Sequence, residues 1–157
     1  MKYLLIVTFL GIVCLGFSCP NGWIANGSKC YHFSREEESW VEAVQVCKQI
    51  QGTLLQIEDA AENAFIQSQA QLTNVNYWID LTDIEQEGTW VWMESGTPLS
   101  TTGFSDWNDD PANYKDDGED CAGLYEADGH KWAVTNCADN YNYICERDNT
   151  DGGSVVG

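Results

Sequence analysis

The sequence predicts one small, disulfide-bonded domain that contains both α-helices and β-strands. Two segments with helix-capping signals lie in its first half, and several short runs of aromatic and β-branched residues follow them. Six of its seven cysteines lie after residue 18. At 157 residues, the chain is long enough to bury a modest core.

The first eighteen residues, MKYLLIVTFLGIVCLGFS, are typical of a cleaved secretory signal. Lys2 provides a basic start, an apolar run extends from Tyr3 to Leu15, and the small residues Gly16 and Ser18 precede the expected cleavage point. The apolar run is short for a membrane-spanning helix, and no second run follows. We therefore expect a secreted, extracellular protein with no membrane anchor.

Cleavage would remove Cys14 and leave an even number of cysteines. The six that remain are Cys19, Cys30, Cys47, Cys121, Cys137 and Cys145. An even number in a secreted chain predicts three disulfides, although spacing alone leaves many pairings open. Zinc binding is disfavoured because the chain has no CxxC pair and only two histidines.

The mature chain is expected to begin with a hairpin and a helix. Residues 19–34 are rich in Gly, Asn and aromatics between two cysteines, which suggests a hairpin closed by a Cys19–Cys30 bridge. Ser39 and Glu42 form a capping box for a helix that should stop near Gly52. Its buried face is expected to comprise Trp40, Ala43, Val44, Cys47 and Ile50.

A second helix is expected at residues 59–70, with Asp59 as its N-cap and Glu62 three residues later. Its expected buried positions are Ala61, Ala64, Phe65 and Ala70. Strands are expected within residues 76–81, 89–93, 121–127, 131–137 and 141–147.

A long stretch without periodicity separates the early strands from the late ones. It runs from Glu94 to Asp120 and is rich in Gly, Pro, Asn and Asp, and an irregular stretch of this length is usually functional or disordered. Phe104, Trp107 and Pro111 argue against simple disorder. Residues 148–157 are expected to form a flexible tail.

The charge of the chain restricts its partners. A formal net charge of −18 disfavours nucleic acid and favours cations, mineral surfaces or simple solubility. Carboxylates concentrate in WNDDPANYKDDGEDC, residues 107–121, which is either a solvated loop or half of a metal site. Because the chain lacks a nucleophile elbow, a His-rich metal motif and a Gly-rich phosphate loop, we do not expect an enzyme. Asn26-Gly27-Ser28 is a possible glycosylation site.

Taken together, these segments resemble the C-type lectin-like domain family over residues 19–147. The resemblance is carried by the order of the six cysteines and by SWVEAVQVC, EDAAENAFI, WIDL, GEDC, KWAVTNC and YNYICE. It implies an α+β fold in which two helices flank antiparallel sheets and a long irregular loop emerges from one side. It also implies the pairs Cys47–Cys145 and Cys121–Cys137, with Cys19–Cys30 as the extra bridge of the long form.

Sugar-binding members of this family hold calcium and sugar in the long loop, and the resemblance of that site is mixed. Asp110-Pro111, followed by Asn113, resembles a distorted Glu-Pro-Asn motif, and Glu119 matches a later family Glu. Ala133 and Val134 replace the Asn and Asp of a Trp-Asn-Asp motif, so the primary calcium site should be impaired. The sugar-contact candidates are Trp107, Asp110, Asn113 and Glu119, although anchoring the loop is the favoured role of Trp107.

The family's auxiliary calcium site is better preserved. Its matching positions here are Asp83, Glu87, Glu119 and Asp120. Tyr114 replaces one further family carboxylate, a gap that Asp110, Asp116 or Asp117 could fill. A solvated turn is an equally acceptable interpretation of Asp83 and Glu87, and a solvated turn is also the favoured interpretation of His130.

These patterns predict a secreted lectin-like protein of innate immunity that recognises cell-surface or microbial glycans. In this hypothesis, calcium orders the long loop and is not required to ligate the sugar. The alternative on the same fold is a non-sugar protein that binds a mineral surface, ice or a protein partner.

Overall fold

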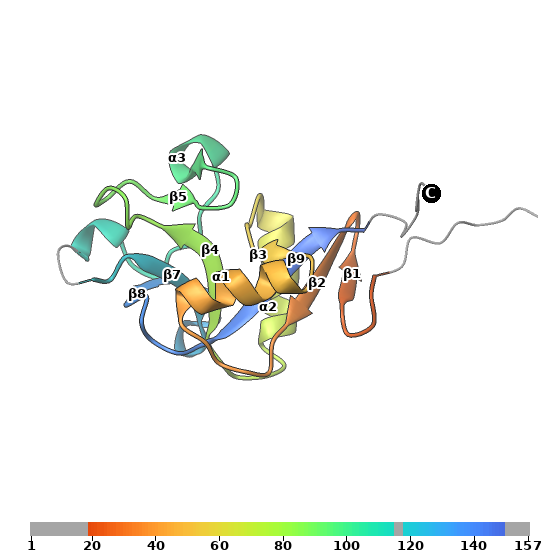
Figure 1. The fold of residues 1–157 in the computed structure, drawn as a ribbon. Helices are drawn as coiled ribbons and strands as arrows, with labels where there is room; N and C mark the ends of the chain where they lie inside the picture. Colours follow the sequence, from red (N-terminus) through yellow and green to blue (C-terminus); the bar gives the residue numbers. More distant parts are fainter. Residues whose placement is uncertain (1–18, 115–117, 150–157) are drawn as a thin grey trace, which may run out of the picture.

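The computed structural model describes residues 19–114 and 118–149 (Figure 1). The expected signal peptide and residues 150–157 of the expected tail lie outside the described residues, as do Asp116 and Asp117. Within the described residues, nine strands join in one connected sheet with the path β1-β2-β9-β4-β5-β6. Strand β3 pairs with β9, while β7 pairs with both β4 and β8.

The two ends of the domain lie side by side in this sheet. The β1 strand (Ile24–Asn26) and β2 (Lys29–Phe33) form the expected hairpin, with Gly27 at φ 58° in its turn. The β2 strand then pairs antiparallel with β9 (Asn142–Asp148), which also pairs with the two-residue β3 (Thr53–Leu54). The first and last strands thus form one end of the molecule in Figure 1.

Helix α1 (Trp40–Gln49) begins as the sequence predicts. The Ser39 hydroxyl accepts a hydrogen bond from the Glu42 N–H, and the Glu42 carboxylate accepts one from the Ser39 N–H, so the capping box is complete. Trp40, Ala43 and Cys47 are buried, as expected. Val44 and Ile50 are only half-buried and pack against the same core cluster.

Helix α2 (Ala60–Ala70) has the predicted Asp59 cap but buries a different face. Ala70 is buried as expected, whereas Ala61 and Ala64 are exposed and Phe65 is only half-buried. The inward positions belong instead to Glu62, Asn63 and Ile66. The prediction was wrong because it placed only apolar residues inside, whereas Glu62 and Asn63 find hydrogen-bond partners there.

Strand β4 (Tyr77–Thr82) lies at the centre of the sheet. It pairs antiparallel with β5 (Val91–Trp92) and β7 (Cys121–Tyr125), and parallel with β9. Side chains alternate across a strand, so Tyr77 and Ile79 join the core cluster that contains α2, while Trp78 joins the cluster that contains α1. The helices therefore cover opposite faces, and the α+β fold is confirmed with one parallel pairing added.

The three disulfides have the pairing that the family resemblance implies. Cys19–Cys30 closes the hairpin, Cys47–Cys145 joins α1 to β9, and Cys121–Cys137 joins β7 to the turn after β8 (Lys131–Thr135). Cys47–Cys145 spans a sequence separation of 98. In the chain-entropy model, closing a loop of this length contributes about 4–5 kcal/mol.

The stretch from residue 94 to 120 contains short elements that the sequence did not predict. These are β6 (Thr97–Pro98), α3 (Leu99–Thr102) and the 3₁₀ turn η1 (Pro111–Asn113). A second 3₁₀ turn, η2 (Glu126–Asp128), joins β7 to β8. Within residues 19–114 and 118–149, none of the helices has the length and apolarity needed to cross a membrane.

Candidate functional site

The long loop is fixed to the body of the domain at Asp106. Its Oδ2 accepts hydrogen bonds from Asn63 Nδ2 at 2.9 Å and Gln67 Nε2 at 2.8 Å, both on α2. The Trp132 N–H donates to the Asp106 carbonyl at 2.9 Å, and the Asn108 N–H donates to the Trp132 carbonyl at 2.8 Å. Residues 106–108 therefore run alongside β8, so the base of the loop has a defined position.

Trp107 strengthens this attachment. Its ring centroid lies 4.9 Å from that of Trp90 and 5.7 Å from that of Trp132, both in edge-on arrangements. Trp107 is partly buried against the main core cluster. The favoured sequence interpretation of Trp107 as a loop anchor agrees with this packing.

A compact polar turn follows this anchor. Asp110 caps η1 by accepting a hydrogen bond from the Ala112 N–H at 2.9 Å. Asn113 Nδ2 donates to Asp109 Oδ1 at 3.3 Å, and all three side chains are exposed. The structure thus brings the predicted residues Asp110 and Asn113 into one turn and adds Asp109, which the sequence interpretation did not select.

The neighbouring strand β8 provides no oxygen ligands where the family motif requires them. Ala133 is 5% exposed and Val134 is 8% exposed, and Val134 belongs to the main core cluster. Their registers opposite Gly123 and Ala122 of β7 place both residues inside the sheet. The donor set does not fit the primary calcium site of the family, because calcium requires oxygen ligands.

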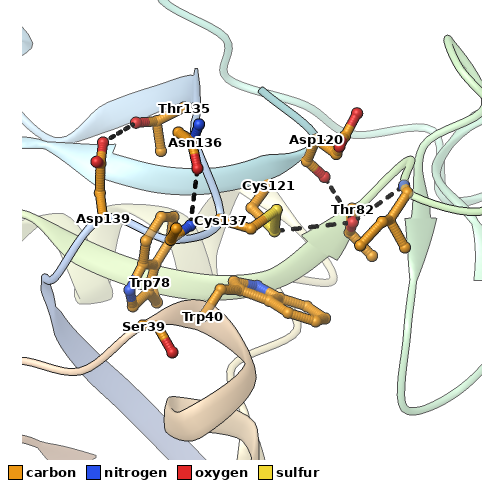
Figure 2. The surroundings of a disulfide bond; sticks show 12 residues. Ser39, Trp40, Trp78, Thr82, Asp120, Cys121, Thr135, Asn136, Cys137 and Asp139 are labelled. Carbon is orange, nitrogen blue, oxygen red and sulfur yellow. Dashed lines mark hydrogen bonds between the residues drawn. A yellow bond between two sulfur atoms is a disulfide. The ribbon is translucent and has the colours of Figure 1, made fainter. Parts of the chain in front are cut away.

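A second group of predicted residues meets where β4 ends and β7 begins. The Thr82 hydroxyl donates to the Asp120 carbonyl at 2.5 Å, and the Asp83 N–H donates to the same oxygen at 3.1 Å (Figure 2 shows the Thr82 bond). The next residue, Cys121, forms the disulfide drawn in Figure 2. The two hydrogen bonds to the Asp120 carbonyl therefore hold Asp83 and Asp120 beside each other, and the Cys121–Cys137 bridge restrains the start of β7 next to them.

The Asp83 carboxylate is buried and incompletely satisfied. It is 4% exposed, its Oδ2 accepts one hydrogen bond from the Gly88 N–H at 2.8 Å, and its Oδ1 has no partner among the described residues. Burial raises the pKa of Asp83. The Gly88 hydrogen bond opposes this rise, while the charges of Glu87 and Asp120 add to it.

The four predicted calcium ligands are not gathered into one cluster. Glu87 and Glu119 are exposed, unlike Asp83. No group of three or more His, Cys, Asp or Glu side chains suited to a metal occurs within residues 19–114 and 118–149. Asp83 and Asp120 nevertheless carry the carboxylate oxygens that a hard cation such as calcium prefers. The Asp83 Oδ1 atom, which has no partner among the described residues, is available to bind such a cation.

His130 differs from its sequence interpretation. It is 1% exposed instead of solvated, and its ring Nε2 lies 3.0 Å from the Val75 carbonyl. Its backbone adopts a left-handed conformation with φ 63°. A turn does form at Asp128-Gly129, as the sequence predicts, but α2 and β4 pack around this turn and cover the His130 ring.

Comparison with known proteins agrees with this architecture. The family model described as the Lectin C-type domain matches residues 36–147. The chain belongs to the C-type lectin domain family. C-type lectin domain family 4 member M from Hylobates lar is 36% identical over 130 residues, which is 82% of this chain and 31% of that protein. The chain thus spans about a third of the length of this relative.

Solved structures show the same fold. The human scavenger receptor C-type lectin carbohydrate-recognition domain is 36% identical, with a TM-score of 0.74 over 83% of this chain and 99% of that chain. A calcium-independent type II antifreeze protein is 23% identical, with a TM-score of 0.72 over 83% of this chain and 95% of that chain. The second likeness concerns the fold alone.

Proposed function

We propose that this chain is a secreted, non-enzymatic carbohydrate-binding protein that recognises cell-surface or microbial glycans. The glycan would contact the loop surface between residues 104 and 136. Family membership supports this general class of ligand, and the relative and the human solved domain described above carry lectin names. A role in innate immunity follows from such ligands and is part of the proposal.

The observation that carries the proposal is the polar turn on an anchored loop. Asp109, Asp110 and Asn113 expose carboxylate and amide groups, which accept and donate the hydrogen bonds that sugar hydroxyls need. The base of the loop is held by Asp106 and Trp107, so little ordering of that segment would be needed on binding. Glu119 is also exposed and can join this surface.

Calcium has a supporting role in this proposal. Asp83, Glu87, Glu119 and Asp120 would hold the ion, and its charge would offset the repulsion between these carboxylates. The unpartnered oxygen of buried Asp83 supports this assignment, and exposed Glu87 and Glu119 would have to turn towards it. Sugar contacts are assigned to the protein side chains, because Ala133 and Val134 have no side-chain oxygen.

A glycan array probed with and without chelator tests the proposal. We expect glycan binding that weakens in chelator and is lost in the double variant Asp110→Ala with Asn113→Ala. Asn140→Ala changes an exposed amide outside the loop and serves as the matched control. A blank array for the folded wild-type protein in both conditions would refute carbohydrate recognition.

A non-sugar surface-binding function is the second candidate. The loss of oxygen ligands at Ala133 and Val134 favours it, and so does a net charge of −18, which suits a calcium-mineral surface. Adsorption to mineral together with a blank glycan array would select this candidate. Ice-growth inhibition would instead indicate an ice-binding role on the same fold, and capture of a protein partner would indicate a protein-binding role.

A further inference from the structure

A pocket of about 490 Å³ opens between the segment that precedes β5 and helix α3. Its principal lining residues are Thr89, Trp90, Leu99, Ser100, Phe104 and Ser105. The volume lies within the range of about 300–1,000 Å³ that is usual for small-ligand sites. Phe104 and Ser105 lie at the start of the 104–136 loop surface, but none of the individual side chains assigned above to sugar or calcium lines the pocket.

The lining has an unusual composition for this protein. The chain carries 25 acidic residues, yet no charged side chain lines this pocket. Trp90, Leu99 and Phe104 supply apolar surface, and Leu99 and Phe104 are only half-buried. Hydroxyl groups come from the exposed residues Thr89, Ser100 and Ser105. A neutral ligand with both an apolar face and hydroxyl groups matches these walls, and a pyranose ring has that chemistry.

The pocket is held open by its backbone. The Leu99 N–H donates to the Trp90 carbonyl at 2.9 Å, which fixes α3 against the opposite wall. Gly88 and Gly103 adopt left-handed φ values of 75° and 74°, and a Cβ on either would project into open space. These glycines leave the rim free of side chains, and a substitution at either would strain the backbone.

The pocket is also connected to the loop surface. Trp90 contacts Trp107 with ring centroids 4.9 Å apart, and the polar turn begins two residues after Trp107. The pocket wall and the base of the polar turn are thus joined by one aromatic contact, and an oligosaccharide that spans both places would contact each of them.

We propose that this pocket is a second subsite that binds a neutral sugar unit of a bound oligosaccharide. The proposal rests on the proposed glycan recognition and assigns it a further contact region. The polar turn makes the hydrogen bonds that any sugar unit requires, whereas the pocket favours longer neutral chains. The pocket adds affinity only to an oligosaccharide that is already held at the turn, so binding of a monosaccharide at the turn should not depend on the pocket.

Backbone-amide NMR mapping separates the two regions. The folded protein is titrated with maltose, lactose and chitobiose, three neutral disaccharides. We expect chemical-shift changes at residues 88–90 and 99–105 as well as at residues 108–113. Shifts confined to 108–113 would overturn the pocket and leave glycan recognition intact. Shifts confined to the pocket would refute the assigned turn, and no shifts with any of the three would refute the pocket.

A blocking variant provides the second test. Ser100→Trp fills the pocket from α3, and Thr101→Trp places the same side chain at the next exposed position, which does not line the pocket. We expect Ser100→Trp to weaken oligosaccharide binding by about tenfold while monosaccharide binding stays unchanged. Equal affinities of the two variants for oligosaccharides would overturn the proposal.

Discussion

Asn63 of α2 accepts a 3.0 Å hydrogen bond from the indole Nε1 of Trp132 on β8, across 69 residues of sequence. The same Asn63 donates to Asp106 at the base of the long loop. One buried amide therefore links a helix, a strand and the loop. The buried Trp132 indole N–H would otherwise be an unsatisfied donor, and the Asp106 carboxylate would lose one of its two amide donors, so the arrangement fixes where the loop begins.

Removing the Asp106 carboxylate should destabilise the domain. We expect Asp106→Ala to lower the free energy of unfolding by about 1–3 kcal/mol, because the Asn63 and Gln67 amides lose their acceptor. Asp106→Asn keeps an acceptor oxygen and should cost less. Urea denaturation measures both, and Asp109→Ala is the exposed control. Equal stability of Asp106→Ala and Asp109→Ala would contradict the anchoring role.

The ion pairs of Lys29 and of Lys48 should differ sharply in their contribution to stability. Lys29 Nζ lies 3.0 Å from carboxylates of both Glu62 and Glu146, whereas Lys48 pairs with Glu94 at the surface at 2.8 Å. Burial opposes the charge of Lys29, but its carboxylate partners outweigh this and raise its pKa. Lys29→Met should cost about 3–5 kcal/mol, because buried carboxylates lose their partner.

The matched change, Lys48→Met, should cost at most about 1 kcal/mol. Burial raises the pKa of Glu146 to about 7 even with Lys29 present. Glu146 can therefore be protonated at pH 5, and the cost of Lys29→Met should be smaller there than at pH 8. Urea unfolding at both pH values measures this difference. If Lys29→Met and Lys48→Met lowered the free energy of unfolding by similar amounts at pH 8, the greater contribution of the Lys29 ion pairs would be refuted.

The buried Asp80 should make the domain less stable above pH 7 than at pH 5. It is 1% exposed, one oxygen accepts from the Glu94 N–H at 2.8 Å, and the other has no partner among the described residues. Burial raises the pKa of Asp80 to about 7; the hydrogen bond from the Glu94 N–H and the charge of Lys48 oppose this rise, while the charges of Glu94 and Glu146 add to it. Between its ordinary pKa and 7, the folded state binds this proton more tightly than the unfolded state does.

The loss of folding stability that results from ionising Asp80 is absent below the ordinary pKa and is complete once the pH has risen through 7. The uncharged variant Asp80→Asn should therefore exceed the wild type in stability by about 1–3 kcal/mol at pH 8. The difference should shrink as the pH falls towards 5. Thermal unfolding across this range measures it, and a difference that stays constant with pH would count against a buried, titrating Asp80.

Calcium should reverse the effect of a change at Asp83. In chelator, Asp83→Asn should be more stable than the wild type, because a buried carboxylate near Glu87 and Asp120 is removed. With calcium added, the wild type should gain melting temperature and show heat of binding by calorimetry, whereas the variant should show neither. Asp148→Asn, at an exposed position in β9, is the control. A wild type without heat or thermal shift would exclude the auxiliary site.

The sequence predicted those features whose signals are local. Ser39 and Glu42 define the start of α1 within four residues, and the resemblance supplied a disulfide pairing that the structure confirms. Sugar and calcium roles at Asp83, Asp110 and Asn113 stay predictions, although the structure places Asp110 and Asn113 in one turn.

Features that depend on distant partners escaped prediction. The buried side of α2 was misassigned because Glu62 and Asn63 become favourable inside only when Tyr31 and Trp132 meet them. Asp106 was not selected for the same reason, since its amide partners lie 39 and 43 residues away in sequence. No local pattern in the sequence distinguishes these acids from the solvated ones around them.

The pairing of β2 with β9 has a practical consequence. The Asn149 N–H donates to the Ser28 carbonyl at 2.7 Å, so residue 149 lies beside the first hairpin, away from α3 and the loop that follows it (Figure 1). A linker joined after residue 149 would attach the domain at the end opposite the long loop and leave that loop exposed to solution. Sensor chips and multivalent displays can therefore be built from this end without masking the surface under test.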